Sequence, residues 1–146
     1  MVRAAAAGSS GLPHRLPLGI AAVLVPALGF ALASASGHGW QRVAMLLLLA
    51  PLLEETVFRA GLQEALLRRW HALPHLANAM TAVAFGLAHA AARNDATGFV
   101  VALPALLIGA VYQRTGRLRL CIALHAAMNA SWLGWSMARS ALPFDW

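Results

Sequence analysis

Residues 41–67 read QRVAMLLLLAPLLEETVFRAGLQEALL and carry the strongest signal for the fold of this chain. Its apolar residues form one continuous helical pattern, and Glu54, Glu55 and Arg59 stand deep inside it. A charged group at the centre of a bilayer costs roughly 3 kcal/mol on insertion scales, so two adjacent carboxylates need a partner or water. We therefore interpret residues 41–67 as a membrane helix that carries a functional site.

The composition of the whole chain supports a membrane protein. Of its 146 residues, 60% are hydrophobic and 11% are charged, and the mean hydropathy is +0.67. A soluble domain is about 45–50% apolar and about 25% charged. These values exclude a disordered chain and predict an all-α, polytopic bundle in which residues 1–146 form a single membrane domain. The single cysteine, Cys121, excludes an intramolecular disulfide and is interpreted as a small buried residue.

Five apolar stretches predict the membrane helices, at residues 16–36, 41–67, 74–92, 97–113 and 118–138. Their connections are short, so sequential helices should be antiparallel. Near its end the first stretch reads ALASA at residues 31–35, and it also resembles a signal peptide with a small-residue cleavage site. We favour a retained span, giving about five, and the alternative is cleavage, giving four.

The positive charge of the chain is better explained by topology than by nucleic acid. The net charge is +6, all eleven basic residues are arginines, and no nucleic-acid motif accompanies them. Loops on the cytoplasmic side of membrane proteins carry excess basic residues. A cytoplasmic N-terminus places seven arginines inside and three outside. The inside set is Arg3, Arg15, Arg68, Arg69, Arg114, Arg117 and Arg119, and the outside set is Arg42, Arg93 and Arg139.

Helical geometry separates the two adjacent carboxylates of the second stretch. Glu55 and Arg59 are spaced i,i+4 and can form an ion pair, whereas Glu54 lies on another face without that partner. Pro51 has no N–H and leaves the Leu47 carbonyl unpaired if the helix is regular. This pattern favours one neutralised and one reactive carboxylate, although a polar core without chemistry would show the same residues.

Two later helices bring further polar pairs at i,i+4 spacing. They are Phe85 with His89, and His125 with Asn129. Each pair alone is consistent with interhelical hydrogen bonding. Combined with Glu54 they indicate a hydrolase, in which Glu54 and His89 activate water and His125 and Asn129 stabilise an oxyanion. His89 and His125 are expected at different depths, so one site requires tilted or shifted helices.

These residues match three motifs in order, namely EExxxR at residues 54–59, FxxxH at 85–89 and HxxxN at 125–129. The set resembles the CPBP family of intramembrane proteases, also called the CAAX-protease or Abi family. The resemblance covers about residues 41–138, which we expect to be the catalytic core. It implies that Glu54 and His89 activate the attacking water, and that Glu55 and Arg59 form a supporting pair.

The resemblance further implies that His125 and Asn129 stabilise the oxyanion and that Phe85 forms a wall of the site. We favour a glutamic-type mechanism without metal or other cofactor. A zinc site formed by Glu54, His89 and His125 is the alternative, but the sequence has no HExxH and Asn129 is not a usual zinc ligand.

The expected partners are the lipid bilayer and a membrane-anchored protein or peptide substrate, and no nucleic acid. The all-arginine, alanine-rich composition favours a bacterial source and the plasma membrane. Short bacterial members of the family resemble proteases paired with C-terminal sorting signals, which favours such a substrate over a prenylated CAAX protein. Two rival functions are a membrane binding or immunity-type protein that uses the same polar cluster, and a small proton-coupled carrier.

Small residues predict where helices approach closely. Their spacing of three or four places them on one helix face in each of the last two stretches. The two sets are Gly98, Ala102, Ala105 and Gly109, and Ala126, Ala130 and Gly134.

Overall fold

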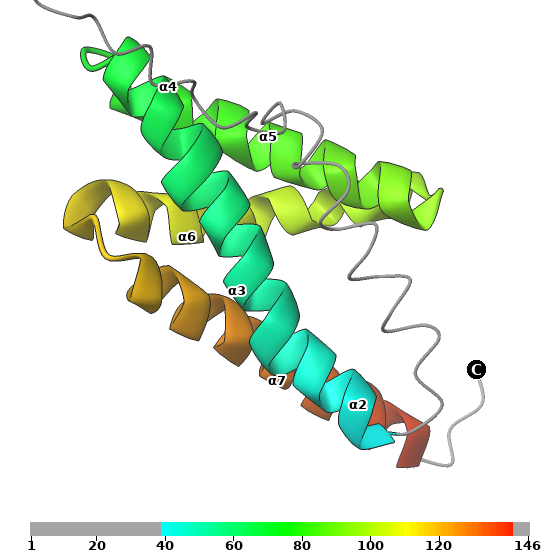
Figure 1. The fold of residues 1–146 in the computed structure, drawn as a ribbon. Coiled ribbons are helices and arrows are strands. Elements are labelled where there is room, and N and C mark those ends of the chain that lie inside the picture. Colours follow the sequence, from blue (N-terminus) through cyan, green and yellow to red (C-terminus); the bar gives the residue numbers. More distant parts are fainter. Residues whose placement is uncertain (1–38, 142–146) are drawn as a thin grey trace, which may run out of the picture.

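The computed structural model describes residues 39–141, and this range is helical without any strand (Figure 1). Residues 39–69 form one long rod. It is composed of α2 (Gly39–Ala44), the π-helical η1 (Met45–Leu49), α3 (Ala50–Glu55), the π-helical η2 (Thr56–Gln63) and α4 (Glu64–Arg69). The rod is followed by α5 (Pro74–Arg93), the 3₁₀ segment η3 (Ala96–Val101), α6 (Ala102–Thr115) and α7 (Leu118–Ala141).

Four of the five predicted helices correspond to these elements. The rod covers residues 41–67, α5 covers 74–92, η3 with α6 covers 97–113, and α7 covers 118–138. Residues 16–36 lie outside the described range, so the structure does not distinguish a retained span from a cleaved signal. By length and composition, one helix in residues 39–141 is apolar enough to cross a membrane, namely Ala96–Thr115, with a mean hydropathy of 1.7.

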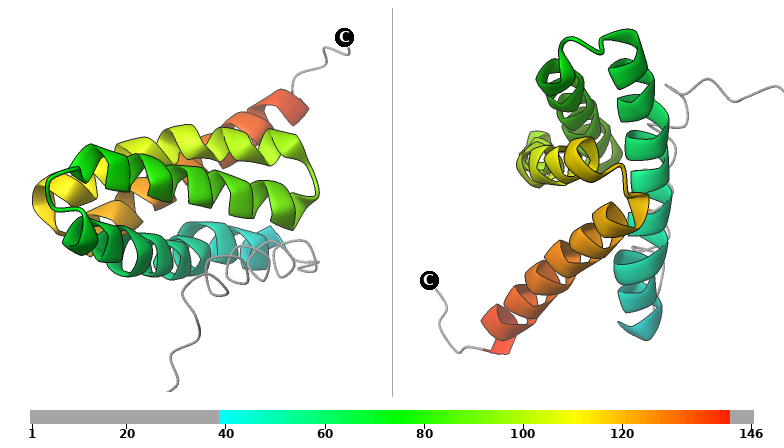
Figure 2. Two further views of the ribbon diagram at one scale, coloured as in Figure 1. Left: turned by 90° about the horizontal axis from the view of Figure 1, so that it is seen from above. Right: turned by 90° about the vertical axis from the view of Figure 1, so that its left-hand side faces the viewer.

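The helices cross one another rather than standing parallel (Figure 2). α5 and α6 lie side by side as an antiparallel pair, the rod crosses them, and α7 runs back along the half of the rod that contains η1 and α3. The helices alternate in direction because their connections are short. At the ends of α5 and α6, one residue with a positive φ turns the chain back. Asn94 ends α5 at φ 50°, and Gly116 ends α6 at φ 61°.

Asp95 starts the helix that follows α5. Its carboxylate accepts hydrogen bonds from the backbone N–H of Thr97 at 2.9 Å and from the Thr97 hydroxyl. Both bonds stabilise the ionised carboxylate, the hydroxyl bond most, and they lower the pKa of Asp95. The cap thus fixes the point at which the chain re-enters the bundle.

The small-residue face of residues 98–109 is confirmed as a packing surface. A Cβ atom added at Gly98 would lie 2.9 Å from the Ala90 Cα, and one at Gly109 would lie 1.8 Å from the Asn78 Oδ1. The second small-residue prediction is wrong within the described residues. Ala130 and Gly134 are exposed, and a Cβ at Gly134 would meet no atom within 4 Å. α7 diverges from the other described helices in this half, so within residues 39–141 its small residues have no helix to contact.

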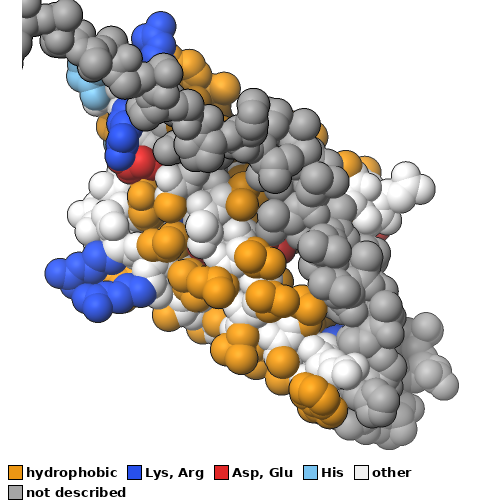
Figure 3. All heavy atoms as spheres, viewed as in Figure 1, with side chains coloured by type: hydrophobic (Ala, Val, Ile, Leu, Met, Phe, Trp, Pro, Cys, Tyr) orange, Lys and Arg blue, Asp and Glu red, His pale blue; other side chains and the backbone are white. Residues whose placement is uncertain are grey.

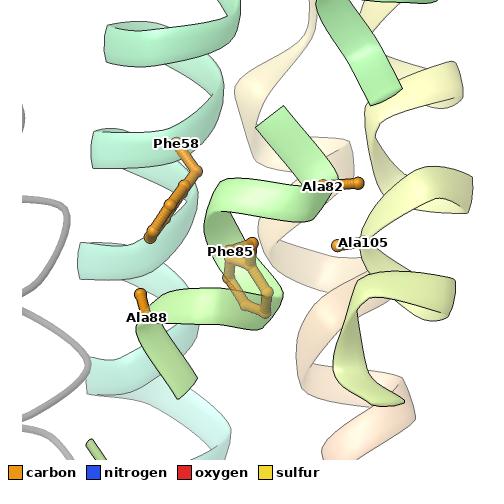
Figure 4. Packing of buried hydrophobic residues seen from close by; sticks show 5 residues of the cluster. All are labelled: Phe58, Ala82, Phe85, Ala88 and Ala105. Atoms are coloured by element: carbon orange, nitrogen blue, oxygen red, sulfur yellow. The ribbon is translucent and has the colours of Figure 1, made fainter. Parts of the chain in front are cut away.

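The main hydrophobic core lies where the rod, α5 and α6 meet. It consists of Phe58, Ala82, Phe85, Ala88 and Ala105 (Figure 4). Small alanines let the backbones approach, and two phenylalanine rings fill the remaining space with centroids 4.8 Å apart in a T-shaped contact. This core supports one side of the polar cluster described below.

The outer faces of the helices are largely apolar. Leu48, Val100, Leu103 and Leu107 are each more than 60% exposed, and Figure 3 shows hydrophobic side chains over much of the described surface. The basic side chains gather instead at the end where α4 finishes and α6 meets α7 (Figure 3). Apolar outer faces are typical of helices that contact lipid. Basic residues gathered at one end are typical of the cytoplasmic side of a membrane protein.

Candidate active site

Pro51 interrupts the backbone hydrogen bonds in the first half of the rod, next to the π-helical η1. The N–H of Ala50 donates to the carbonyl of Met45, one residue further back than in an α-helix. In this π-helical register the next donor would be residue 51, a proline without an N–H, so the Leu46 carbonyl receives no backbone hydrogen bond from it. The side-chain amide of Asn129 donates to the Leu46 carbonyl at 2.9 Å. The proline therefore creates the acceptor that attaches α7 to the rod.

Arg59 occupies the centre of a fully buried polar network. Its Nε donates to the Glu55 Oε2 at 2.9 Å, Nη1 to the Gln63 Oε1 at 3.0 Å, and Nη2 to the Ala105 carbonyl at 3.0 Å. The predicted ion pair is thus present, with both side chains 0% exposed. Gln63 in turn donates to the Gly109 carbonyl at 2.9 Å. The network fastens the rod to α6 from within.

Glu55 also holds a histidine in place. The Nδ1 of His125 lies 2.7 Å from the second oxygen of Glu55, Oε1. Because a carboxylate accepts, this nitrogen is assigned as the donor, which turns the Nε2 of His125 away from Glu55. Glu55 therefore links Arg59 of the rod to His125 of α7. These helices are far apart in the sequence, and residue spacing alone did not indicate the contact.

His89 is oriented by its own helix. Its Nδ1 lies 3.0 Å from the carbonyl of Phe85, which can only accept, so Nδ1 is assigned the proton. In a neutral ring the lone pair is then on Nε2. The rings of Phe85 and His89 are stacked with centroids 4.4 Å apart. Phe85 thereby fixes both the tilt and the tautomer of His89.

Glu54 lies between the two imidazoles. Its Oε2 is 3.7 Å from the Nε2 of His89 and 3.7 Å from the Nε2 of His125. Within the described residues its carboxylate accepts no hydrogen bond, although the residue is only 5% exposed. A separation of 3.7 Å exceeds a direct hydrogen bond and is the kind of gap that water bridges.

These groups line one cavity of about 150 Å³. The rod, α5, η3 with α6, and α7 all contribute to its wall. The polar side chains on the wall are Glu54, His89, Arg93, His125 and Asn129, and Phe85 is also on it. The rest of the wall is mostly apolar and includes Val101, Pro104 and Met128. Such a space can hold several water molecules.

The structure brings together the motif residues of all three helices. The expected difference in depth between His89 and His125 does not separate them, because the helices cross at an angle (Figure 1). Glu55 and Arg59 lie behind the cavity rather than on its wall. Asn129 is on the wall, and one of its two amide hydrogens is engaged by Leu46.

Two polar residues of the network were missed in the sequence. Gln63 follows Arg59 at the same i,i+4 spacing as Glu55, which is a signal that could have found it. Asn78, one of the polar residues in the apolar stretch 74–92, donates to the Leu106 carbonyl at 3.1 Å. Its Oδ1 is buried without a partner within the described residues. Nothing in its spacing singles it out.

A zinc site needs at least three ligand side chains arranged around one ion. Within residues 39–141 no group of three or more His, Cys, Asp or Glu side chains is arranged to hold a metal ion. His89 and His125 both direct Nε2 toward Glu54, so these three residues are the set that a zinc ion would use if the zinc alternative held.

A family described as type II CAAX prenyl endopeptidase Rce1-like matches residues 36–131, about two thirds of the chain. The matched range contains all three motifs, and the resemblance drawn from them is confirmed. No curated protein and no solved structure matches the chain.

Proposed function

The chain belongs to the Rce1-like family of type II CAAX prenyl endopeptidases, and we propose that it is a glutamic-type intramembrane endopeptidase. The observation that carries this proposal is the position of Glu54. Its carboxylate has no hydrogen-bond partner within residues 39–141, lies 3.7 Å from two imidazole nitrogens, and lines a small cavity. A buried carboxylate placed between two imidazoles can exchange a proton with a bound water.

The proposed reaction begins with a water that contacts the Oε2 of Glu54 and the Nε2 of His89. The water attacks the carbonyl carbon of the substrate, a C–O bond forms, and its proton passes to Glu54. The oxyanion accepts hydrogen bonds from the free amide hydrogen of Asn129 and from the Nε2–H of His125. This role needs the imidazolium form of His125, in which Nδ1 donates to Glu55 and Nε2 also carries a proton. Glu54 then returns the proton to the nitrogen, the C–N bond breaks, and a carboxylic acid and an amine leave.

Glu55 and Arg59 act at a distance from the reacting atoms. Arg59 balances the charge of Glu55, and Glu55 holds the Nδ1 of His125. They are therefore positioning residues in this scheme. Phe85 contributes in the same way, because its ring stacks on His89 and its carbonyl fixes the tautomer.

We propose a multi-pass protein of the bacterial plasma membrane with about five spans and a cytoplasmic N-terminus. The basic end at α4, α6 and α7 would face the cytoplasm. The substrate would be a membrane-anchored protein, cut near a C-terminal sorting signal. The reaction would proceed without metal. Cleavage by the purified protein that survives removal of divalent cations by a chelator is the expected result, and loss restored by zinc would contradict it.

The first test compares protein termini in membranes of cells that carry the wild-type chain or Glu54→Gln. New termini that occur only with the wild type support the protease and identify its substrate. Glu64→Gln is the matched control, because Glu64 lies on the same rod and is paired with Arg68 outside the cavity. If no termini differ while precursors are expressed, the binding or immunity-type function is favoured instead.

A further inference from the structure

One cation on the cavity wall has no part in the proposed hydrolysis. Arg93 is the only arginine among the described residues that line the cavity, and it is exposed. It lies in the last turn of α5, at i+4 from His89. The two side chains thus share a face of the helix, about 6 Å apart along its axis.

The guanidinium of Arg93 has no bonded partner among residues 39–141, although its charge acts on Glu54, His89 and Asp95 from a distance. No hydrogen bond or ion pair joins it to any residue in the range 39–141. The nearest acid along the chain, Asp95, is bonded to Thr97 instead. The arginine behind the cavity, Arg59, is buried and has three acceptors. Arg93 is therefore free to bind an anion that enters the cavity.

We propose that Arg93 binds a carboxylate of the substrate, an inference that rests on the proposed protease function. An extended peptide rises about 3.3 Å per residue. A peptide bond held at Glu54 and His89 therefore places the carboxylate about two to three residues away, toward the C-terminal end of α5. Guanidinium and carboxylate form paired N–H···O bonds, and a mostly aliphatic cavity leaves few competing polar partners.

The carboxylate has two possible sources, an acidic side chain and the free C-terminus of the substrate. The test uses four probes that represent them. N-octanoyl-alanine carries a terminal carboxylate and N-octanoyl-alaninamide is its neutral match. N-octanoyl-aspartate α-amide carries a side-chain carboxylate and N-octanoyl-asparaginamide is its neutral match. All four have the same apolar chain, so differences between matched probes report the charge.

The readout is the rate at which phenylglyoxal modifies individual arginines of the full chain in lipid nanodiscs, measured by mass spectrometry. Arg139 is the internal control, since it also lies in the last turn of a helix and does not line the cavity. We expect a saturating acid probe to slow the modification of Arg93 about tenfold and to leave Arg139 unchanged. The stronger of the two acid probes identifies the source of the carboxylate.

Equal protection by an acid and its neutral match overturns the proposal, as does the absence of protection by both acids. Failure of Arg93 to react in the free protein also overturns it, because its guanidinium would then be engaged. The measurement reports binding and needs no turnover, and it is repeated with Glu54→Gln. Failure of the binding proposal can therefore be distinguished from failure of the proposed protease function. With the substrate in hand, Arg93→Gln should raise KM about tenfold or more at unchanged kcat, and Arg139→Gln should not.

Discussion

Glu54 and Glu55 are neighbours on one helix, yet their surroundings differ in nearly every respect. Glu55 is 0% exposed and both of its oxygens are bonded, one to Arg59 and one to His125. Glu54 is 5% exposed, and its Oε2 lies 3.7 Å from the Nε2 of His89 and 3.7 Å from the Nε2 of His125. One step along a helix rotates a side chain by about 100°, from a closed network to a cavity.

Burial alone therefore does not leave a carboxylate oxygen available to bind water. Glu55 is the more buried of the two, but its partners fix it in place and occupy its oxygens. Glu54 keeps an oxygen available because its neighbours stop short of hydrogen-bond distance. We therefore expect substitutions at Glu54 to change the rate of cleavage, and substitutions in the network of Glu55 to change the free energy of unfolding.

The largest expected effect is on catalysis. Glu54→Gln should lower kcat about 10²–10⁴-fold, since the amide cannot take a proton from water. Its resistance to unfolding in detergent should be unchanged or greater, because no hydrogen bond is lost. Cleavage by purified protein and a denaturant titration measure the two quantities. Cleavage retained in the variant would exclude Glu54 as the base.

The second prediction concerns the stability of the network. Arg59→Met should lower the free energy of unfolding by about 3–5 kcal/mol, because it leaves Glu55 buried and uncompensated. Adding Glu55→Leu should recover part of the loss. The same denaturant titration measures both.

The control for this prediction is Arg68→Met. Arg68 and Glu64 form a pair of the same i,i+4 spacing and the same 2.9 Å length, but Arg68 is 78% exposed. That variant should change the free energy of unfolding by no more than about 1 kcal/mol. Equal losses for Arg59→Met and Arg68→Met would show that burial does not distinguish the two pairs.

A third, smaller effect is expected where α6 contacts the network. Gly109→Ala should destabilise by about 1–3 kcal/mol, because its Cβ would lie 1.8 Å from the Asn78 Oδ1 and 2.8 Å from the Arg59 Nη1. Gly134→Ala is the matched variant in an open position. It should be neutral or stabilising, and thermal unfolding of the two proteins in one detergent compares them.

The smallest effect concerns the contact of α7 with the rod. Asn129→Ala should destabilise by about 1 kcal/mol, because the Leu46 carbonyl loses its donor. Pro51→Ala restores a backbone N–H near that carbonyl, so the double variant should lose less than Asn129→Ala alone. Strict additivity of the two changes would disprove the link between proline and asparagine.

Much of this protein followed from the sequence because the decisive signals are local. The apolar lengths determined four helices of the described range, and i,i+4 spacing identified the Glu55–Arg59 pair. Three short motifs in order identified the family. Each of these depends on residues within one or two turns of a single helix, where the geometry is known in advance.

Contacts between helices could not be read from the sequence and come from the packing of the folded chain. This packing joined Glu55 to His125 across 70 residues, placed Glu54 between two histidines, and gave the Leu46 carbonyl near Pro51 a donor from α7, the amide of Asn129. It also recruited Gln63 and Asn78 through carbonyls of α6. Such contacts depend on the angles at which helices cross and on a local π-helical register, and both are set by the packing of whole helices.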